Sequence, residues 1–581
     1  AGRGELVSMA LAASVSKWRQ ALTEPSSSLS GHLQVIYGEH GDAWRQLYLR
    51  ILDDFEATFG AQEGPVVISR CPGQMNIMGM HIDYGGMPSL RLAVKGHDTV
   101  TVVRQRDDDV ARLHSRYEGP EGNRDFEPAE FSVRELASPD PLGDSRQALM
   151  EYAGQICTER ERQTGSTIDD SWSILPQGQL VYLDSWLRGR DRTLTGLDAY
   201  VYSNVSPSGG MSSSSALVIS TAYAALGMYG VVPGQDMTWE DAIDGVGTSE
   251  WIRGTRGGTA DHGGMVLGLA GELVSVGVFP AQPCGNAPLP PEFVAVIFDS
   301  GVPRVYDEAG KEETVLAYPL GTFVVRDLLL PKRVGQLGWE GLRCDFHDRI
   351  ELIRDITPEN LGITSAQLSE LLLEVPQKTS LSQVESWAAE EGQATAFSEM
   401  VAQDVGAKFP RITADVDIYL RRRFLFGLAE QDRVAATVDY LAAGDLPTVF
   451  ELVRLSHEGD YDEEVEDAEL EQIAQRAAAG DPRGRLAFVP GGYGRMTPAY
   501  DQFVVALNDF LSSYGQDAGA IQRLGAGWGG NVGGLISRRF LAGDERQALE
   551  RLLRDDLGVH VDLDSCVATP GQGAGLLPAP A

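Results

Sequence analysis

Cysteine is scarce in this 581-residue chain, and its spacing argues against the structures that depend on it. The five cysteines are scattered, and no two of them form a CxxC pair. An odd number at irregular spacing disfavours a disulfide framework, and the missing pairs disfavour a structural zinc site. We therefore expect a protein of the reducing cytoplasm.

Long apolar runs and positive charge are also in short supply. No uninterrupted apolar run reaches the roughly 18 residues of a membrane-spanning helix, and we expect no secretory signal at the start. Lys and Arg number 48 against 83 Asp and Glu, a formal net charge of −35. Such a surface repels phosphate backbones and anionic membranes, so we expect neither as a partner. A nucleotide can still bind, because local backbone N–H groups and Mg²⁺ outweigh the global field.

The sequence lacks the GxxxxGK[ST] pattern of a standard P-loop. Gly525, Gly527 and Gly530 do satisfy GxGxxG, the dinucleotide pattern. The residues that follow, 531–537, indicate a strand rather than a helix, so a phosphate there would meet no helix start. We therefore discount a dinucleotide site.

A Gly/Ser-rich turn offers a different phosphate site. It spans Asn204 to Ala216 (NVSPSGGMSSSSA), between a predicted strand at 197–205 and a predicted helix at 216–230. The first amides of a helix have no intrahelical partner, and with the positive end of the helix dipole they attract an anion. Serine hydroxyls there can also bind phosphate or Mg²⁺. The alternative is an ordinary Ser-capped helix after a flexible loop.

A polar segment at 70–86 (RCPGQMNIMGMHIDYGG) contains groups suited to a sugar. His81, Asp83 and Tyr84 lie within four residues beside two glycines. Carboxylates accept hydrogen bonds from hydroxyls, and histidine can donate or accept. The alternative is a polar turn with no ligand.

A second polar segment, at 250–264 (EWIRGTRGGTADHGG), supplies carboxylates. Asp261 lies in its Gly-rich part, and a carboxylate on a rigid turn can take a hydroxyl proton as general base. Glu250 can complete a Mg²⁺ shell, which needs only one or two protein oxygens. The alternative for each is a solvated acidic side chain.

Periodicity places regular elements along the chain. We expect helices at 43–59 and over most of 412–474, and strands at 65–69, 99–103, 272–279 and 293–297. Cys71-Pro72-Gly73 is expected to end the strand before it. Residues 107–184 are polar and irregular, which indicates surface insertions.

A proline-rich stretch at 281–291 is the expected boundary between two halves. We therefore predict an N-terminal domain at 1–290 and a C-terminal domain at 291–568. The Gly/Pro/Ala-rich residues 569–581 are expected to form a flexible tail.

In their order, these segments resemble the GHMP kinase superfamily, and specifically its galactokinase branch. The family's opening motif, APGRVNLIGEHTDY, is similar to 71–84 (CPGQMNIMGMHIDY). Its phosphate loop, PxGxGLSSSA, and its GIMDQ are similar to 207–216 (PSGGMSSSSA) and 258–262 (GTADH). Its late TGAGFGGC and its helical SHxSLRxDY resemble 524–531 (LGAGWGGN) and 452–461 (LVRLSHEGDY). The chain is longer than a usual member, with the excess around 107–184, 320–385 and 462–497.

The resemblance implies an α+β, two-lobed GHMP kinase fold with the active site in the cleft between the N- and C-terminal domains. It implies ATP as co-substrate, Mg²⁺ as cofactor and Asp261 as the general base. The implied ATP-binding residues are Pro207, Ser208, Gly209, Gly210, Met211, Ser212, Ser213, Ser214 and Ser215. The implied sugar-binding residues are Met80, His81, Asp83, Tyr84, Gly258 and Tyr318. The implied Mg²⁺ ligands are Ser214 and Glu250.

In the phosphate loop, Met211 stands in place of the family's last glycine and Ser212 in place of its leucine, and two positions of the opening motif also depart from the family. Gln74 stands where the family has an arginine near the transferred phosphate, a group comparable to those that supply roughly 10³–10⁵ in rate. Arg70, Arg253 and Arg256 are close in sequence and are candidates to replace its charge. Met80 stands where the family has a glutamate that resembles a partner of the sugar's hydroxymethyl group. A methionine suits an apolar or absent group, so we expect a sugar that differs from galactose at C5 or C6.

The expected function is ATP-dependent phosphorylation of a sugar hydroxyl, the anomeric O1 of a galactose-related sugar. The alternative is a catalytically weak, sugar- and ATP-binding regulatory protein on a galactokinase scaffold, which Gln74 favours. A third reading is a kinase that acts on a sugar-containing natural product or on another hydroxyl. We expect a monomer or a homodimer.

Overall fold

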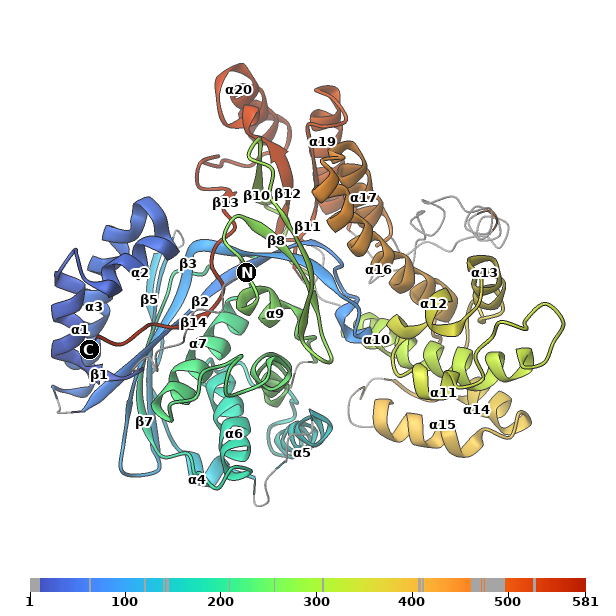
Figure 1. Ribbon diagram of the computed structural model, residues 1–581, viewed down its shortest axis with the longest axis horizontal. Coiled ribbons are helices and arrows are strands. Elements are labelled where there is room, and N and C mark those ends of the chain that lie inside the picture. The colour runs from blue at the N-terminus through green and yellow to red at the C-terminus, as the bar shows by residue number, and fades with distance from the viewer. Residues whose placement is uncertain are drawn as a thin grey trace. The chain divides into compact units, whose positions relative to one another are not determined.

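In a computed structural model, the chain is described over residues 11–61, 64–119, 122–138, 142, 146–207, 209–254, 256–305, 308–405, 409, 412–460, 472, 475, 497–525 and 529–580. Helices and strands alternate irregularly, in agreement with the predicted α+β class (Figure 1). The described residues form two compact units. The first contains those up to Met75, those of Arg91–Pro283 and those of Ala568–Ala581, and the second contains Asn76–Leu90 and Cys284–Val567.

The division at Pro283 lies inside the predicted proline-rich boundary, but the stretch is not a bare linker. It forms strand β9 (Gln282–Pro288), which carries the chain from one unit into the other. The sequence also gave no sign that residues 76–90 belong to the second unit. The end of β2 (Pro65–Met78) and the start of β3 (Ser89–Gln105) lie in this segment, so both strands extend beyond the first unit.

A large sheet forms the centre of the first unit. Its main order is β1-β2-β3-β7-β4-β5, with β14 beside β2, β6 beside β4 and β8 beside β3. Only the β4–β7 pair among the registers described is parallel. The further strands are β1 (Ala13–Ser14), β4 (Val110–Gly119), β5 (Gly122–Asp125), β6 (Ala129–Ser132), β7 (Leu197–Ser203), β8 (Glu272–Gly277) and β14 (Gly575–Leu576).

β2 is longer than predicted. Pro72 and Gly73 lie inside it instead of ending it, because pairing with the neighbouring β3 overrides the local break. Every residue of β2 after Pro65 is buried, as expected of a strand that is covered on both faces.

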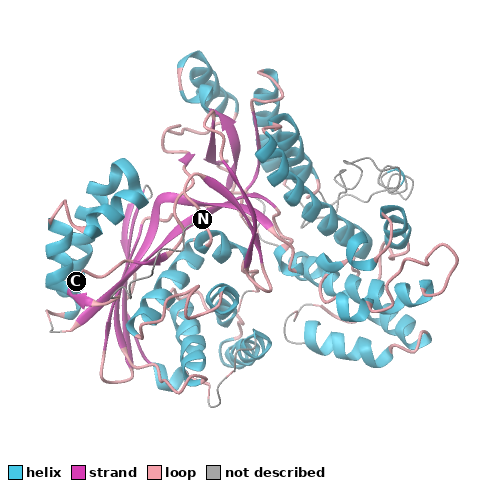
Figure 2. Cartoon of the chain, in the orientation of Figure 1, coloured by secondary structure: helices cyan, strands magenta, loops and turns pink. Residues whose placement is uncertain are grey.

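Helices cover both faces of this sheet (Figure 2). On one face, α1 (Val15–Thr23), α2 (Ser28–Tyr37) and α3 (Gly41–Phe59) share a core with alternate residues of β2, β3 and β7. On the other, Ser220 of α7 contacts β2 and β3, its carbonyl accepting from Ser69 and its hydroxyl lying 2.9 Å from that of Thr101. The helices on this side are α5 (Arg146–Thr164), α6 (Ile174–Arg188), α7 (Ser213–Met228), α8 (Val246–Thr248) and α9 (Ala260–Val266).

The prediction that residues 107–184 are irregular insertions is wrong for the described part. Burial alternates along β4 from Val110 to Glu118, with Arg112, His114 and Arg116 on the less buried face. The charged residues made the segment look polar overall, although it has the two-residue period of a strand. α6 is buried along nearly its whole length. A buried helix has no polar face, and this removes the amphipathic period that identifies a helix in a sequence.

A four-stranded sheet, in the order β11-β12-β10-β13, lies in the second unit. Its strands are β11 (Gly519–Arg523), β12 (Asn531–Ser537), β10 (Phe293–Asp299) and β13 (Val567–Ala568). β12 has the predicted bounds, and residues 531–537 run antiparallel to β10. The helices α19 (Pro498–Ser513) and α20 (Gly543–Arg551) contribute to the core of this sheet.

A second core in this unit is helical and includes most of the predicted insertion at 320–385. Its helices are α10 (Glu308–Phe323), α11 (Phe346–Arg349), α12 (Pro358–Leu361), α13 (Ser365–Leu373), α14 (Leu381–Glu390), α15 (Ala394–Met400), α16 (Leu420–Ala443) and, beside them, α17 (Leu446–Glu458). The long helices α16 and α17 agree with the helical pattern predicted over 412–474, and the insertion at 462–497 lies almost wholly outside the described residues.

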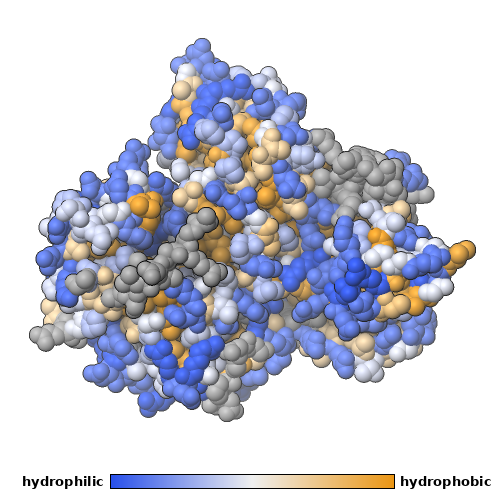
Figure 3. Space-filling view, viewed as in Figure 1, coloured by the Kyte–Doolittle hydropathy of each residue, from blue (hydrophilic) through white to orange (hydrophobic). Residues whose placement is uncertain are grey.

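One helical stretch in the described part, Ala309–Arg333, is long and apolar enough to cross a membrane. However, 78% of its apolar window is buried inside the protein, as in the core helix of a soluble protein. This stretch is therefore weak evidence for a membrane span. Hydrophilic side chains dominate the face drawn in Figure 3.

The C-terminal residues differ from the predicted flexible tail. Gly575 and Leu576 pair with Arg70 and Ser69 of β2, and Leu577 is buried in the core beneath α1 to α3. Their Gly/Pro/Ala composition is typical of a frayed end. Here the pairing with β2 and the burial of Leu577 hold the segment in place.

Candidate active site

The loop between β7 and α7 has the open helix start that a phosphate site requires. Ser212 precedes α7 with φ +57°, a left-handed conformation. Its side chain does not cap its own helix, and its hydroxyl instead donates to Oδ2 of Asp261 at 2.6 Å. The alternative of an ordinary Ser-capped helix is therefore wrong. The first amides of α7 keep their capacity to bind an anion.

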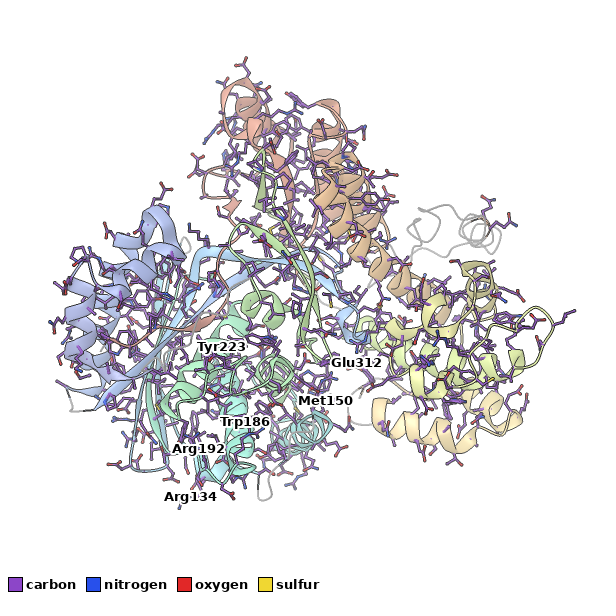
Figure 4. The ribbon with its side chains drawn as sticks, in the orientation of Figure 1. Arg134, Met150, Trp186, Arg192, Tyr223 and Glu312 are labelled. Carbon is purple, nitrogen blue, oxygen red and sulfur yellow. The ribbon has the colours of Figure 1, made fainter. Side chains whose placement is uncertain are left out.

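The remaining residues of this loop line the same helix start. Pro207 is exposed, Gly209, Gly210, Ser213 and Ser214 are half-buried, and Met211 and Ser215 are buried; Ser208 lies outside the described residues. A side chain at Gly209 would come within 2.8 Å of the Ser206 Cβ, so the turn needs glycine there. Further along α7, Tyr223 is fully buried and anchors the helix (Figure 4).

Asp261 lies in the first turn of α9 and faces that loop through Ser212. Its side chain is 39% exposed, so a substrate can reach it. Oδ1 accepts hydrogen bonds from Gln74 Nε2 at 3.2 Å and from the Arg91 guanidinium. Burial opposes ionisation, but the charge of Arg91 and the Ser212 hydrogen bond outweigh it and lower the pKa of Asp261. Asp261 is thus an ionised, accessible carboxylate, the state a general base requires.

Glu250 is engaged with a histidine. It lies on the short helix η4 (Ser249–Arg253), and its Oε1 is 2.8 Å from Nε2 of His262, the residue after Asp261. His262 is buried, and although burial opposes its charge, Glu250 raises the pKa of His262. Glu250 therefore has a structural partner that the sequence did not predict.

The oxygens predicted to hold Mg²⁺ are of the right type for it. Ser214 offers a half-buried hydroxyl in the first turn of α7, and Glu250 offers a carboxylate that is 19% exposed. No group of three or more His, Cys, Asp or Glu side chains suited to a metal occurs among the described residues. Mg²⁺ binding by Ser214 and Glu250 stays a prediction.

All the predicted sugar residues except Gly258 lie in the second unit, and most of them belong to or precede a short helix, η2 (Asp83–Gly85). Met80, His81 and Asp83 are buried, and Tyr84 is half-buried against the helical core. The Tyr318 hydroxyl donates to the backbone carbonyl of His81 at 3.2 Å. The structure therefore brings Tyr318, from a distant segment, to the opening motif.

His81 also contacts an arginine that sequence analysis missed. A guanidinium nitrogen of Arg523, at the end of β11, lies 2.5 Å from Nε2 of His81, and Arg523 forms an ion pair with Asp460. Because a guanidinium only donates, Nε2 must accept, so the His81 ring is neutral with its proton on Nδ1. Burial lowers the pKa of Arg523 to about 9. Arg523 precedes the Gly-rich motif directly, and this position is the one signal that could have suggested it.

Comparison with known proteins identifies the same segments. The galactose-binding signature of galactokinases matches residues 53–105, and the N-terminal domain of GHMP kinases matches residues 181–268. The first match covers the opening motif, and the second covers the phosphate loop and Asp261. These matches support a galactokinase-like kinase of the GHMP superfamily.

Individual relatives agree with this assignment. The galactokinase of Streptomyces coelicolor is 29% identical over 34% of this chain and 37% of its own length. The galactokinase of Schizosaccharomyces pombe is 25% identical over 46% of each chain. The matched region thus spans less than half of these relatives. The crystal structure of Lactococcus lactis galactokinase complexed with galactose has the same fold, with a TM-score of 0.52 and 15% identity over 91% of this chain and 99% of that one.

Two of the departures from the family's motifs, Gln74 and Ser212, lie in contact in the first unit. Gln74 replaces the family's arginine and Ser212 replaces its leucine, and Gln74 Nε2 donates to the Ser212 hydroxyl at 3.1 Å. The Gln74 backbone N–H also donates to the carbonyl of Met211 at 3.1 Å. The substituted positions are therefore part of one hydrogen-bonded group around Asp261.

The three arginines nominated from the sequence to replace the family's charge are engaged elsewhere. Arg70 pairs with Asp98 at 2.7 Å, Arg253 with Asp170 at 3.2 Å, and Arg256 donates to the carbonyl of Trp251 at 3.1 Å. No hydrogen bond or ion pair joins any of them to Asp261 in the part of the chain that the structure describes. Whether any of the three reaches the transferred phosphate stays a prediction.

Arg91 is the guanidinium that reaches this group. It lies on β3, is buried, and donates to both Asp261 and Oε1 of Gln74, the latter at 3.0 Å. The only sequence signal was a charged residue inside the otherwise apolar run 90–94, where an isolated charge requires a partner.

Gly258 lies three residues before Asp261, in the turn that leads into α9. Its role as a sugar contact, like the roles of Met80, His81, Asp83, Tyr84 and Tyr318, stays a prediction. So does the cleft between two domains as the location of the site.

Proposed function

We propose that this chain is an ATP-dependent sugar kinase in which Asp261 is the general base. The observation that supports it most strongly is the hydrogen bond from Ser212 to Asp261. This bond places an ionised carboxylate at the uncapped start of α7, where phosphates are attracted. Phosphoryl transfer needs little else from a protein beyond positioning and charge.

In the proposed reaction, the first amides of α7 and the loop 207–215 hold the phosphates of ATP. Mg²⁺, held by the phosphates with Ser214 and Glu250, would neutralise charge on them. The sugar hydroxyl gives its proton to Asp261 while its oxygen forms a bond to the γ-phosphorus. The bond from that phosphorus to the ADP oxygen breaks, and ADP leaves with the electron pair.

We infer that the acceptor is the anomeric O1 of a galactose-related sugar that differs from galactose at C5 or C6. His81, Asp83, Tyr84, Gly258 and Tyr318 would bind its hydroxyls. Met80 is buried, and its thioether cannot match the hydrogen bonding of the family's glutamate to a hydroxymethyl group. A site without that partner loses its advantage for a 6-hydroxyl.

The regulatory alternative keeps one supporting observation, the uncharged Gln74 at the family's arginine position. A protein of that kind would bind sugar and ATP without turnover. In the kinase, Asp261 is needed for turnover; in the regulatory protein, it would only help to form the binding site.

An assay of ADP release with a panel of free sugars tests the proposal. At least one galactose-related sugar should stimulate release, and Asp261→Asn should lower kcat by about 10²–10⁴ while ATP still binds. Asp107→Asn removes an exposed carboxylate from the turn after β3 and should leave kcat unchanged. Equal turnover in wild type and Asp261→Asn, or no turnover with any sugar, would refute the kinase. Preference for galactose over all 6-modified sugars would refute the substrate inference.

We further propose a cytoplasmic monomer or homodimer that acts on small molecules, without a nucleic acid or a membrane as partner. The strong negative charge and the scarcity of cysteine support this. Size-exclusion chromatography with light scattering would determine the oligomeric state.

A further inference from the structure

Asp261, Gln74, Ser212 and Arg91 form a closed ring of hydrogen bonds in the first unit. Arg91 donates to Gln74 Oε1 at 3.0 Å and to Asp261. Gln74 Nε2 then donates to the Ser212 hydroxyl at 3.1 Å and to Asp261 at 3.2 Å. Ser212 in turn donates to Asp261 at 2.6 Å. Arg91, Gln74 and Ser212 therefore each donate one hydrogen bond to the Asp261 carboxylate.

The direction of the ring is dictated by its two charged members. The Arg91 guanidinium only donates and the Asp261 carboxylate only accepts, so the Gln74 amide must present its oxygen to Arg91 and its nitrogen to Asp261 and Ser212. The Ser212 oxygen then receives a hydrogen bond, and its own proton points to Asp261. Removing the guanidinium leaves the Gln74 oxygen without this donor and Asp261 with one charged hydrogen bond fewer, so the ring is open on that side.

Arg91 and Gln74 also form a matched pair in charge. They lie on the neighbouring strands β3 and β2. An arginine at both positions would place two buried cations against one carboxylate, and like charges at this range repel strongly. With Gln74 uncharged, one guanidinium donates to Asp261 in the described part of the chain, and it comes from the adjacent strand.

We propose that Arg91 is a positioning residue for phosphoryl transfer, which acts through Gln74 and Ser212 and replaces the charge that the family motif carries at position 74. The inference rests on the proposed kinase function. It explains why the two departures from the family motif, at positions 74 and 212, lie in contact. It also removes the main argument for an inactive site, because the charge is moved and not lost.

Gly264 of α9 packs closely against the aliphatic part of Arg91. An ideal Cβ at Gly264 of α9 would lie 2.9 Å from the Arg91 Cδ and 3.1 Å from its Cβ. Gly264→Ala should therefore displace the guanidinium without touching any polar group. Gly257, which has open space around its Cβ position, is a matched control for this change.

Five variants, one of them a control, separate positioning from simple folding support. Arg91→Gln should lower kcat by about 10²-fold, the cost of misplacing a reacting group by an ångström, with a smaller change in KM. Arg91→Lys should keep part of the activity. The double variant Gln74→Arg with Arg91→Gln, which returns the charge to β2, should recover at least tenfold over Arg91→Gln. Gly264→Ala should behave as a weak Arg91→Gln, and Gly257→Ala as wild type.

The pH profile adds a readout that folding support alone does not move. The charged or titratable groups near Asp261 are Arg91 of β3 and His262 of α9, with Glu250 and Asp244 acting on His262. Without Arg91 the pKa of Asp261 rises, so the acid limb of kcat/KM should move to higher pH. Loss of kcat with an unmoved acid limb and no recovery in the double variant would overturn the inference. Full activity of Arg91→Gln would overturn it as well.

One measurement distinguishes this inference from the kinase proposal itself. The carboxylate band of Asp261 can be titrated by difference infrared spectroscopy, wild type minus Asp261→Asn, with no substrate present. The titration should move to higher pH in Arg91→Gln. An unmoved titration rejects the role of Arg91 whatever the activity. If the titration moves but the protein has no turnover with any sugar, the role of Arg91 in the ring is supported and the kinase proposal is rejected.

Discussion

At the scale of single residues, Asp261 combines ionisation with access to substrate. Burial of part of the carboxyl would raise its pKa, but Arg91 and Ser212 lower it. A carboxyl whose pKa is lowered in the folded state also stabilises the fold above its ordinary pKa, and this contribution is lost as the pH falls. The same contacts therefore serve stability and chemistry.

Met80 should determine the choice of sugar. Met80→Glu restores the acceptor that the family motif carries, and we expect it to raise kcat/KM for galactose relative to a 6-deoxy sugar. The expected change is about tenfold, the value of one hydrogen bond to a charged group. Met80→Leu keeps an apolar side chain and should keep the wild-type preference. Identical preferences in Met80→Glu and Met80→Leu would contradict this role.

The sequence was sufficient for the residues that lie inside contiguous motifs and insufficient for those that come from outside. Asp261 and Ser212 are each visible in a Gly- or Ser-rich segment. Arg91 and Arg523 have no motif of their own, and only the pairing of β3 and the end of β11 bring them to these segments. Long-range partners of this kind depend on the fold and not on local pattern.

At the scale of elements, α6 carries an unfavourable residue. Gln179 is fully buried, and neither atom of its amide has a hydrogen-bond partner in the described part of the protein. A buried amide without partners costs about 1–3 kcal/mol. Gln179→Leu, similar in volume, should raise the free energy of unfolding by that amount in urea titrations. A lower free energy of unfolding would show that an unseen partner satisfies the amide.

The helix α17 should make stability depend on pH. Burial is the main cause that lowers the pKa of His457, opposed by its contact with Asp501 at 3.2 Å. Below the ordinary pKa of about 6.5, the unfolded chain binds a proton that the folded protein does not. The free energy of unfolding should therefore fall as the pH is lowered from 8 to about 5. His457→Gln should weaken this dependence, whereas His560→Gln, at an exposed position, should not. Equal pH dependence in all three proteins would contradict it.

The predictable and the poorly predictable elements differ in local sequence pattern rather than in burial. The pattern of 531–537 indicated β12 with its observed bounds. In contrast, β2 runs through a Pro-Gly pair and α6 has buried polar residues along its length. In both cases tertiary contacts override the local signal.

At the scale of the whole molecule, the chain forms two units, and the predicted functional groups are divided between them. The phosphate loop and Asp261 belong to the first unit, and residues 76–90 with Tyr318 belong to the second. Gln74 lies on β2, and the sugar motif follows in the segment that joins β2 to β3. The sequence indicated two halves but not this exchange of segments, since a strand pattern does not show where a sheet ends.

The most direct test of the account is a crystal structure with a non-hydrolysable ATP analogue and Mg²⁺. The account predicts that the phosphates bind the backbone N–H groups of Ser213 to Ser215 at the start of α7, with the γ-phosphate next to Asp261. Phosphates bound elsewhere, for example along the Gly-rich motif at 524–530, or a γ-phosphate remote from Asp261, would contradict it.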